Sequence, residues 1–485
     1  MLAAWTEEPA TSGRRSPCAG DLRRCLDDQK AASLREGSPA LKERLRDLQA
    51  LKGAVLAYRD RFVDAVSADF GHRSRQETSY LDILPVVTTI GYLQRNLARW
   101  MRPESRRVAF HFRPGRARVA YQPLGVVGII SPWNYPIVLA LTPLATALAA
   151  GNRVMLKPSE VTPRTSELLA AMLDEVFPAE RVAVVTGDAS VAATFANLPF
   201  DHLIFTGSTS VGRAVMRAAS DNLVPVTLEL GGKSPAIVER GTSLRRAAHG
   251  IAFGKLANAG QTCIAPDYVL VAQEEVEGFT AAFRREVERF YPQIATNPDY
   301  ATIVNDRHHA RLRGLLDDAR AKGGLVQEIG SRDDGRPPLH PRTFLPTLVT
   351  RPTDAMSLMQ EEIFGPILPI VPYATLDEAI AFVNARARPL ALYFFGSKGR
   401  AQAEVLARTI SGNVTVNDTL LHYAQDDLPF GGVGASGMGA YHGHEGFKAL
   451  SHARGIFVQP RLNASDVVRP PFRALFERVI AHLLR

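Results

Sequence analysis

Apolar positions recur at helical spacing in two stretches near the start of the chain. The first runs over residues 41–66 and the second over about 81–100, and a repeat of three to four residues predicts amphipathic helices. Over residues 107–122 apolar positions alternate with polar ones on either side of Pro114-Gly115. Alternation interrupted by a turn pair predicts a β-hairpin.

From Gly125 onward, short apolar runs alternate with helical segments such as Pro163–Val176. This alternation is typical of doubly wound α/β folds built on parallel sheets. A second α/β run begins near Pro235, and no low-complexity linker separates the two runs. We therefore predict two closely packed α/β units. Their strands are expected at 126–130, 153–156, 182–185 and 202–205 in the first unit, and at 268–271, 367–371 and 413–416 in the second.

The two ends of the chain depart from this pattern. Residues 1–38 are rich in small and charged types without periodicity, so we expect a loose tail. Residues 471–485 predict a helix that docks on its own subunit or on a partner; the alternative is a basic amphipathic helix on a membrane surface. The apolar face of that helix consists of Phe472, Leu475, Phe476, Val479, Ile480, Leu483 and Leu484.

The composition excludes several classes of protein. Hydrophobic residues make up 46% of the chain and charged residues 22%, as in an ordinary globular protein. Three irregularly spaced cysteines, Cys18, Cys25 and Cys263, exclude a disulfide scaffold and favour a reducing compartment. The net charge of +8 comes largely from local arginine clusters without a basic, aromatic-interleaved stripe, which argues against nucleic-acid binding.

No segment has the properties of a membrane span or a secretory leader. The most apolar stretch, residues 137–150, is shorter than the roughly 20 residues that a bilayer needs. The N-terminal residues carry charges but no apolar run. We therefore expect a cytoplasmic protein.

Two residues are the main candidates for chemistry. Cys263 follows Gly260-Gln261-Thr262, a polar, turn-like approach that suits a nucleophile better than a buried packing residue. Glu229 interrupts an apolar strand just before Gly231-Gly232. Burial there would raise its pKa and suit a general base; the alternative is a charge on an edge strand that faces solvent.

Three glycine-rich segments could bind a phosphate. Gly432–Gly437 matches the dinucleotide pattern, but no strand precedes it and further glycines follow it, so we reject it. Gly207–Gly212 has the spacing of a P-loop but lacks its lysine, which disfavours nucleotide hydrolysis. The same segment nevertheless joins a strand to a helix, whose N-terminal amides could hold a phosphate.

Other polar residues allow both a functional and a structural interpretation. Lys157 and Glu160 follow a strand and could bind ribose hydroxyls, or they could form a solvated turn. Asn134 could stabilise an oxyanion or close an Asx turn. His442 and His444 flank Gly443 without a cysteine or acidic cluster, so we expect no metal site.

Taken together, these segments resemble the NAD(P)-dependent aldehyde dehydrogenase superfamily from about Leu41 to Val458. Seven stretches carry the resemblance, and Glu229 and Cys263 lie 34 positions apart as in the family. Residues 258–266 and 427–447 carry a finer likeness to the class 3 branch, and within it to coniferyl aldehyde dehydrogenases. The seven stretches are residues 132–136, 157–160, 205–212, 228–233, 260–263, 361–366 and 429–432.

The resemblance implies a fold of two doubly wound α/β domains with a β arm that joins subunits, and a homodimer. It implies a cofactor-binding domain at 39–230 with a bridging hairpin at 107–122, and a catalytic domain at 231–425. Residues 426–485 would supply a return segment, an arm strand near 455–459 and the C-terminal helix.

The resemblance also implies the chemistry. Cys263 would attack the aldehyde, Asn134 and the Cys263 backbone N–H would hold the oxyanion, and Glu229 would activate the water that hydrolyses the thioester. NAD or NADP would accept the hydride, and no metal is expected. The residues expected to contact the cofactor are Ser131, Pro132, Trp133, Lys157, Ser159, Glu160, Gly187, Gly207, Ser208, Val211, Leu230, Glu362 and Phe364.

Three alternatives stay open at this point. Coniferyl or similar aromatic aldehydes are favoured as substrate, with medium-chain or fatty aldehydes as the alternative. A cofactor-independent cysteine hydrolase is the alternative from another class, against which the segment 361–366 argues. The choice between NAD and NADP is open, because Glu160 would repel a 2′-phosphate whereas Lys157 would attract one.

Overall fold

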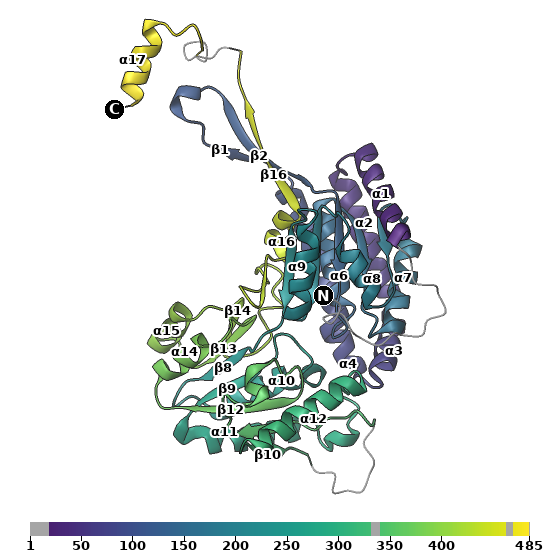
Figure 1. Cartoon of the computed structure of the whole chain (residues 1–485), viewed down its shortest axis with the longest axis vertical. Helices are drawn as coiled ribbons and strands as arrows, with labels where there is room; N and C mark the ends of the chain where they lie inside the picture. The colour runs from purple at the N-terminus through teal and green to yellow at the C-terminus, as the bar shows by residue number, and fades with distance from the viewer. Residues whose placement is uncertain (1–18, 331–339, 462–468, 485) are drawn as a thin grey trace.

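A computed structural model describes residues 19–330, 340–461 and 469–484 of the chain. Its elements form two α/β domains and an arm that projects from them (Figure 1). The seven strands predicted for the two α/β units are all present, to within one or two residues at their ends. Among the described residues, no helix is long and apolar enough to cross a bilayer.

The first domain is built on a six-stranded sheet in the order β15-β7-β6-β3-β4-β5. All neighbours pair in parallel except β15, which runs antiparallel to β7. The chain winds outward in one direction from β3 and in the other from β6, so the switch in topology falls between these two strands. The strands are β3 (Val126–Ile130), β4 (Arg153–Lys157), β5 (Val182–Val184), β6 (His202–Gly207), β7 (Val226–Leu230) and β15 (Gly437–Met438).

Alternate side chains of this sheet pack into two separate cores, because both faces carry helices. One face packs with α2, α3 and α5–α7, and the other with α1, α8 and α9. The helices are α1 (Ala19–Glu36), α2 (Leu41–Ala57), α3 (Arg59–Phe70), α4 (Arg75–Glu77), α5 (Leu84–Trp100), α6 (Val138–Ala150), α7 (Pro163–Val176), α8 (Ala189–Ala196) and α9 (Thr209–Ser220). A π-helical turn, η2 (Thr78–Ile83), leads into α5.

The expectation of a loose tail is wrong for residues 19–36, which form helix α1. Leu22 and Leu26 are buried, and the Gln29 side chain donates to the carbonyl oxygens of Val154 (3.1 Å) and Ala179 (2.7 Å). Spacings of three and four residues place these side chains on one stripe of the helix. Many charged residues flank this stripe in the sequence, so its apolar periodicity is weak. Residues 1–18, including Cys18, lie outside the described residues.

The second domain is built on a seven-stranded sheet in the order β10-β11-β12-β9-β8-β13-β14, parallel except at β10. One continuous apolar core surrounds it. The strands are β8 (Pro235–Val238), β9 (Tyr268–Ala272), β10 (Leu325–Glu328), β11 (Thr347–Thr350), β12 (Ile367–Tyr373), β13 (Ala391–Phe395) and β14 (Asn413–Val416). The helices are α10 (Leu244–Leu256), α11 (Val276–Phe290), α12 (Asp306–Ala321), α13 (Ser357–Gln360), α14 (Leu376–Asn384) and α15 (Arg400–Arg408), with 3₁₀ turns η4 (Ala257–Gly260), η5 (Gln273–Glu275) and η6 (Ile294–Thr296).

The arm is a three-stranded antiparallel sheet in the order β1-β2-β16. Its strands are β1 (Glu104–Arg106), β2 (Arg116–Pro123) and β16 (Ser451–Val458), and β16 extends the predicted arm strand by several residues. The predicted hairpin exists, but its first strand is β1 rather than residues 108–112. Phe110–Phe112 instead form a 3₁₀ turn, η3, in the connection to β2. Alternation was a poor guide here because these phenylalanines lie at an exposed tip, where no buried face sets the register.

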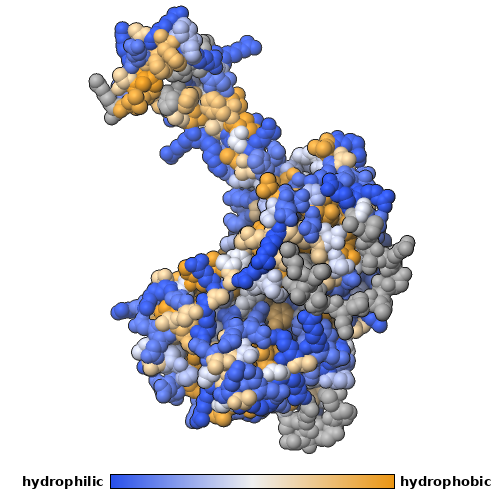
Figure 2. All heavy atoms as spheres, in the orientation of Figure 1, coloured by the Kyte–Doolittle hydropathy of each residue, from blue (hydrophilic) through white to orange (hydrophobic). Residues whose placement is uncertain are grey.

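The C-terminal helix is shorter than predicted and stands apart from both domains. Helix α16 (Gly443–Ala449) leads into β16, and α17 (Ala474–Leu483) lies near the end of the arm (Figure 1). None of the residues of α17 is buried, so the structure does not show the expected docking on its own subunit. Figure 2 shows apolar side chains on the arm and on α17 that face the surroundings.

Candidate active site

A cavity of about 340 Å³ lies between the two domains. On the side of the first domain, its walls come from the turns at the carboxyl ends of β3, β4 and β6. This is the topological switch point, where doubly wound sheets bind their ligands. On the other side, its walls come from segments that precede β8, β9 and β12, the three central neighbours of the second sheet. The cleft thus joins the carboxyl end of one sheet to the amino end of the other.

Most of the residues predicted from the sequence line this cavity. Among the residues that line it are Ser131, Pro132, Trp133, Asn134, Lys157, Ser159, Glu160, Gly207, Ser208, Val211, Glu229, Cys263, Glu362 and Phe364. Gly187 and Leu230 are not part of the lining. The space above Gly187 is filled by Val191, and the Leu230 side chain packs over Gly212 in the apolar core.

Cys263 is carried into the cavity by an unusual backbone turn. Asn258, Ala259 and Gly260 have φ values of 52°, 51° and 76°, three consecutive left-handed residues. Only glycine fits the last position, because a Cβ there would lie 2.4 Å from the carbonyl oxygen of Gly365. The turn delivers a half-buried cysteine that packs against the apolar core of the second domain and also lines the cavity.

The electrostatic surroundings of the Cys263 thiol are largely unfavourable to the thiolate. Burial first, and then the carboxyl groups of Glu362 and Glu229, raise the pKa of this thiol to about 12. The backbone N–H groups of Cys263 and Ile264 hydrogen-bond to the sulfur and act in the opposite direction. The same N–H of Cys263 can donate to an oxyanion that forms beside the sulfur.

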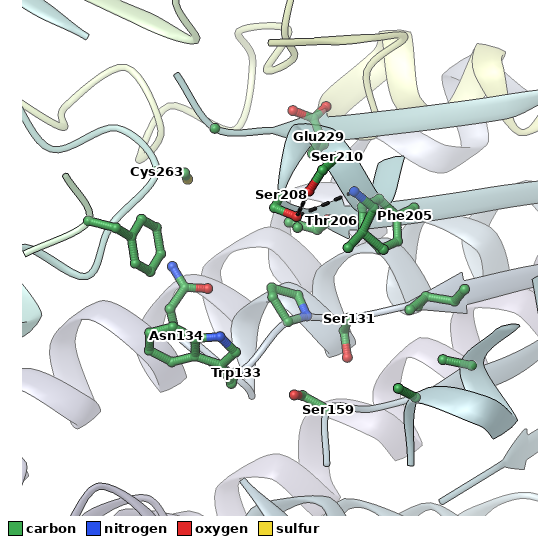
Figure 3. A pocket seen from close by; sticks show the side chains of 18 of the residues that line it. Ser131, Trp133, Asn134, Ser159, Phe205, Thr206, Ser208, Ser210, Glu229 and Cys263 are labelled. Carbon is green, nitrogen blue, oxygen red and sulfur yellow. Dashed lines mark hydrogen bonds between the residues drawn. The ribbon is translucent and has the colours of Figure 1, made fainter. Parts of the chain in front are cut away.

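Asn134 lies across the cavity from Cys263 and is held firmly. The side-chain Nδ2 of Asn134 donates to the backbone carbonyl oxygen of Gln261 (3.1 Å). The backbone carbonyl oxygen of Asn134 accepts from Asn258 Nδ2 (2.9 Å). One amide hydrogen then remains for the cavity. Figure 3 shows the amide nitrogen of Asn134 turned toward Cys263.

Glu229 is a buried carboxyl group without hydrogen-bond partners among the described residues. It lies on β7, is 2% exposed, and neither carboxylate oxygen has a partner. Burial raises its pKa well above the ordinary value. Gly431 lies beside this side chain: a Cβ there would lie 3.2 Å from Glu229 Oε1 and 2.1 Å from the carbonyl oxygen of Gly439. These properties favour a general base rather than a solvated edge-strand charge.

The opposite end of the cavity has the features of a dinucleotide site. Ser208 caps α9 by accepting from the Val211 N–H (3.4 Å), and this helix N-terminus lines the crevice through Ser208, Ser210 and Val211. Lys157 and Glu160 form an ion pair beside it. Ser131 Oγ is buried and has no hydrogen-bond partner among the described residues. An orphaned hydroxyl, a helix N-terminus and an ion pair in one crevice fit a sugar-phosphate ligand.

Aromatic rings narrow the cavity between its two ends. The Trp133 ring lies 5.4 Å from Phe364 and 5.0 Å from His308, measured between centroids. Phe364 has a φ of 49°, a left-handed conformation that is strained for an aromatic residue. Glu362 lies beside it, and burial raises the pKa of its carboxyl group to about 8.

Sequence analysis missed His308 and Arg307 as lining residues. Both lie at the start of α12 on the catalytic-domain side, in a stretch that carries no motif. The Gly432–Gly437 segment, rejected above, ends in β15, which pairs with β7 at Gly437. His442 packs against Tyr441, and His444 stacks on Trp100 (5.2 Å).

A nucleotide-type crevice that continues to a cysteine, an amide and a buried carboxyl group defines an oxidoreductase of the aldehyde dehydrogenase class. Comparison with known families agrees. Residues 19–456 match the model of the Aldehyde dehydrogenase family, and the chain belongs to this family.

Curated relatives and solved structures extend the comparison over nearly the whole chain. A probable coniferyl aldehyde dehydrogenase of Pseudomonas aeruginosa is 50% identical and covers 94% of each chain. The coniferyl aldehyde dehydrogenase of a Pseudomonas species is 48% identical over 96% of this chain and 97% of its own. The substrate-bound state of Staphylococcus aureus AldH superposes with a TM-score of 0.88 at 37% identity, covering 95% of this chain and 99% of that one.

Proposed function

We propose that this aldehyde dehydrogenase oxidises an aromatic aldehyde of the coniferyl type to its carboxylic acid with NAD or NADP. The main support is that Cys263, Asn134 and Glu229 all line one cavity, and that the cavity continues into the nucleotide-type crevice. The catalytic assignments below rest on this arrangement and on the family.

The Cys263 thiol first loses its proton to solvent, and the thiolate then attacks the aldehyde carbon to form a tetrahedral thiohemiacetal alkoxide. The new oxyanion accepts hydrogen bonds from the free Asn134 amide hydrogen and from the Cys263 backbone N–H. Loss of hydride from this adduct leaves a thioester on Cys263. Glu229 takes a proton from a water molecule, which attacks the thioester and releases the acid and the thiol. The raised pKa of Glu229 makes it a stronger base than an ordinary carboxylate.

The crevice fits NAD or NADP, judged by the orphaned Ser131 hydroxyl and the capped N-terminus of α9. When bound, the nicotinamide supplies the hydride acceptor. Lys157 and Glu160 would bind the adenosine ribose, and Gly207 and Ser208 the pyrophosphate. Glu362 and Phe364 would position the nicotinamide end.

The substrate assignment rests on the relatives at 48–50% identity that are named coniferyl aldehyde dehydrogenases. The rings of Trp133, Phe364 and His308 also offer flat faces to an aromatic substrate. Initial rates with coniferaldehyde, benzaldehyde and octanal, each with NAD and with NADP, test the proposal. We expect the highest kcat/KM with coniferaldehyde. A preference for octanal would overturn the aromatic assignment, and no oxidation of any aldehyde would overturn the activity.

We also propose that the protein is a homodimer joined through its arm. The side chain of Phe457 on β16 is 50% exposed, and Phe110 at the tip is 83% exposed. Exposed aromatic side chains on a sheet that stands away from the body are typical of a surface that binds a partner. A second copy of the chain supplies such a surface by symmetry.

A further inference from the structure

A short segment of the cofactor-binding domain lies against both turns of the active site. We call residues 70–77 the strap; it begins at the last residue of α3 and includes α4. The strap is tied to the catalytic domain through Thr302. The Thr302 hydroxyl donates to the carbonyl oxygen of Phe70 (2.7 Å), and the Thr302 N–H donates to that of His72 (3.0 Å). The strap therefore fixes a junction between the two domains.

Arg73 of the strap holds the turn that carries Asn134. Its side chain is fully buried, and its Nη1 donates to the carbonyl oxygen of Asn134 (3.0 Å). The guanidinium group lies 4.6 Å above the centroid of the Tyr135 ring and 3.8 Å from Asp82 Oδ2. Asp82 in turn accepts from the N–H groups of Ile137 (3.1 Å) and Val138 (2.7 Å) at the start of α6. Among the described residues Nε and Nη2 of Arg73 have no hydrogen-bond partner, so the Nη1 hydrogen bond, the Tyr135 ring and the Asp82 charge are the contacts that hold this side chain.

Glu77 of the strap holds the turn that carries Cys263. Its Oε1 accepts a short hydrogen bond from the backbone N–H of Asn258, the first of the three left-handed residues. Asn258 also donates through Nδ2 to the backbone carbonyl oxygen of Asn134 (2.9 Å). This oxygen therefore accepts two hydrogen bonds, one from Asn258 and one from Arg73. The turn that carries Asn134 and the turn that carries Cys263 are thus joined at this oxygen. Arg73 of the strap holds the first turn, and Glu77 of the strap holds the second.

We propose that Arg73 and Glu77 are positioning residues that fix the distance between the Asn134 amide and Cys263. The inference rests on the proposed function, in which these two groups bind the same oxyanion. Left-handed backbone at Asn258 and Ala259 is strained for residues with a side chain, and it persists only where the surroundings hold it. Without the Glu77 acceptor, the turn loses a restraint at its first residue.

The expected effect is on rate rather than on cofactor affinity. Oxyanion donors act at about 2.7–3.1 Å, and a displacement of about 1 Å costs about a hundredfold in rate. Neither Arg73 nor Glu77 lines the cavity, so substitution leaves the contacts to the cofactor in place.

Glu77→Ala and Glu77→Gln test the proposal as a pair in the full-length protein. Glu77→Ala removes the acceptor, and we expect kcat to fall by between about tenfold and a hundredfold while the Kd for NADH or NADPH stays within about twofold. Glu77→Gln retains a carbonyl acceptor for the Asn258 N–H, so we expect it to restore most of kcat. A Glu77→Ala enzyme with wild-type kcat, or a Glu77→Gln enzyme as slow as Glu77→Ala, would overturn the role of Glu77.

Arg73→Met combined with Asp82→Asn tests the other half of the strap. The double substitution removes both buried charges together and leaves an acceptor for the Ile137 and Val138 N–H groups, which protects folding. Arg75→Met is the matched control, because Arg75 lies two residues away in an exposed ion pair with Asp64. We expect kcat to fall about tenfold or more in the double variant and to stay unchanged in Arg75→Met. Equal kcat in both would refute a positioning role for Arg73.

Alkylation of Cys263 by iodoacetamide separates a failure of this inference from a failure of the proposed function. If the wild-type protein oxidises no aldehyde, the activity assignment fails, but thiol reactivity still reports on the turn. We expect Glu77→Ala to alkylate more slowly than wild type, because a looser turn loses the N–H groups that hydrogen-bond to the sulfur. Equal alkylation rates in wild type and Glu77→Ala would show that the strap does not hold the turn.

Discussion

Replacing Glu229 by glutamine separates the two halves of the proposed reaction. The substitution keeps the size and shape of the side chain but removes its capacity to accept a proton. Hydride loss from the Cys263 adduct does not involve Glu229, so we expect a burst of about one NADH per active site. Hydrolysis of the thioester does involve it, and loss of a general base typically lowers such a step by a factor of about 10² to 10⁴.

The structure also predicts how this step depends on pH. Both carboxylate oxygens of Glu229 are buried without a partner among the described residues, and burial raises the pKa well above the ordinary value. Once it has lost its proton, a carboxylate in this environment is a stronger base than a solvated one. In wild type, steady-state turnover limited by hydrolysis should rise with pH as Glu229 loses its proton, with a midpoint above the ordinary carboxyl range. Glu229→Gln should lose this pH dependence.

Stopped-flow measurement of NADH formation, followed by quenching and detection of the acyl-enzyme by mass spectrometry, provides the assay. Glu362→Gln is the matched control, because Glu362 is a second buried carboxyl group in the same cavity. Its proposed role is to position the nicotinamide end, so we expect a slower burst rather than a slower second phase. Absence of a burst in Glu229→Gln would refute the assignment and move this residue to an earlier step.

Three further predictions concern the sulfur, the cofactor and the arm. Cys263→Ala should abolish aldehyde oxidation, whereas Cys25→Ala on α1 should retain it; substantial turnover without Cys263 would exclude it as the nucleophile. Glu160→Gln removes the charge that would repel a 2′-phosphate, so the ratio of kcat/KM for NADP over NAD should rise by about tenfold, and an unchanged ratio would place the phosphate elsewhere. Phe457→Asp on the arm should shift sedimentation from dimer to monomer, whereas Leu223→Asp, at an 89% exposed position on the body, should not; a dimer that persists in Phe457→Asp would argue against an arm interface.

Local signals in the sequence were enough to predict the two sheets and much of the cavity. Parallel strands buried on both faces appear as short apolar runs, and the turns after β3 and β6 carry their polar residues within a few positions of the strand end. Contacts between segments that are far apart in the sequence could not be predicted from these local signals. Glu77 and the Asn258 N–H are 181 residues apart, and nothing in the sequence near either residue indicates the other.

The errors share a physical cause. Helix α1 was missed because its few buried side chains lie among many charges, so burial came from the tertiary contact to β4 and not from a strong local pattern. Alternation in the arm indicated the wrong first strand because an exposed tip does not penalise a shift of register. Leu230 and Gly187 belong to segments adjacent to the cavity, but their own surroundings are apolar packing.

The two sheets present opposite ends to the cavity, and this difference explains why the catalytic turn needs support from outside its own domain. The cofactor-binding domain uses the carboxyl ends of β3, β4 and β6, where polar turns are held by the strands before them and the helices after them. The catalytic domain instead offers segments that lead into β8, β9 and β12. Cys263 precedes β9, so no strand fixes the turn that delivers it.

The left-handed turn at Asn258–Gly260 must therefore be restrained by side chains that arrive from elsewhere. Gln261 follows the turn directly; its Nε2 donates to the Thr302 carbonyl oxygen (3.0 Å), and its Oε1 accepts from the Val304 N–H (2.9 Å). Glu77 contributes from the other domain. Substitutions that weaken the sheets should lower stability, whereas substitutions at Glu77 should lower rate in a protein that remains folded. A thermal melt recorded beside kcat for Glu77→Ala distinguishes the two, since a rate loss that merely tracks unfolding would disappear at low temperature.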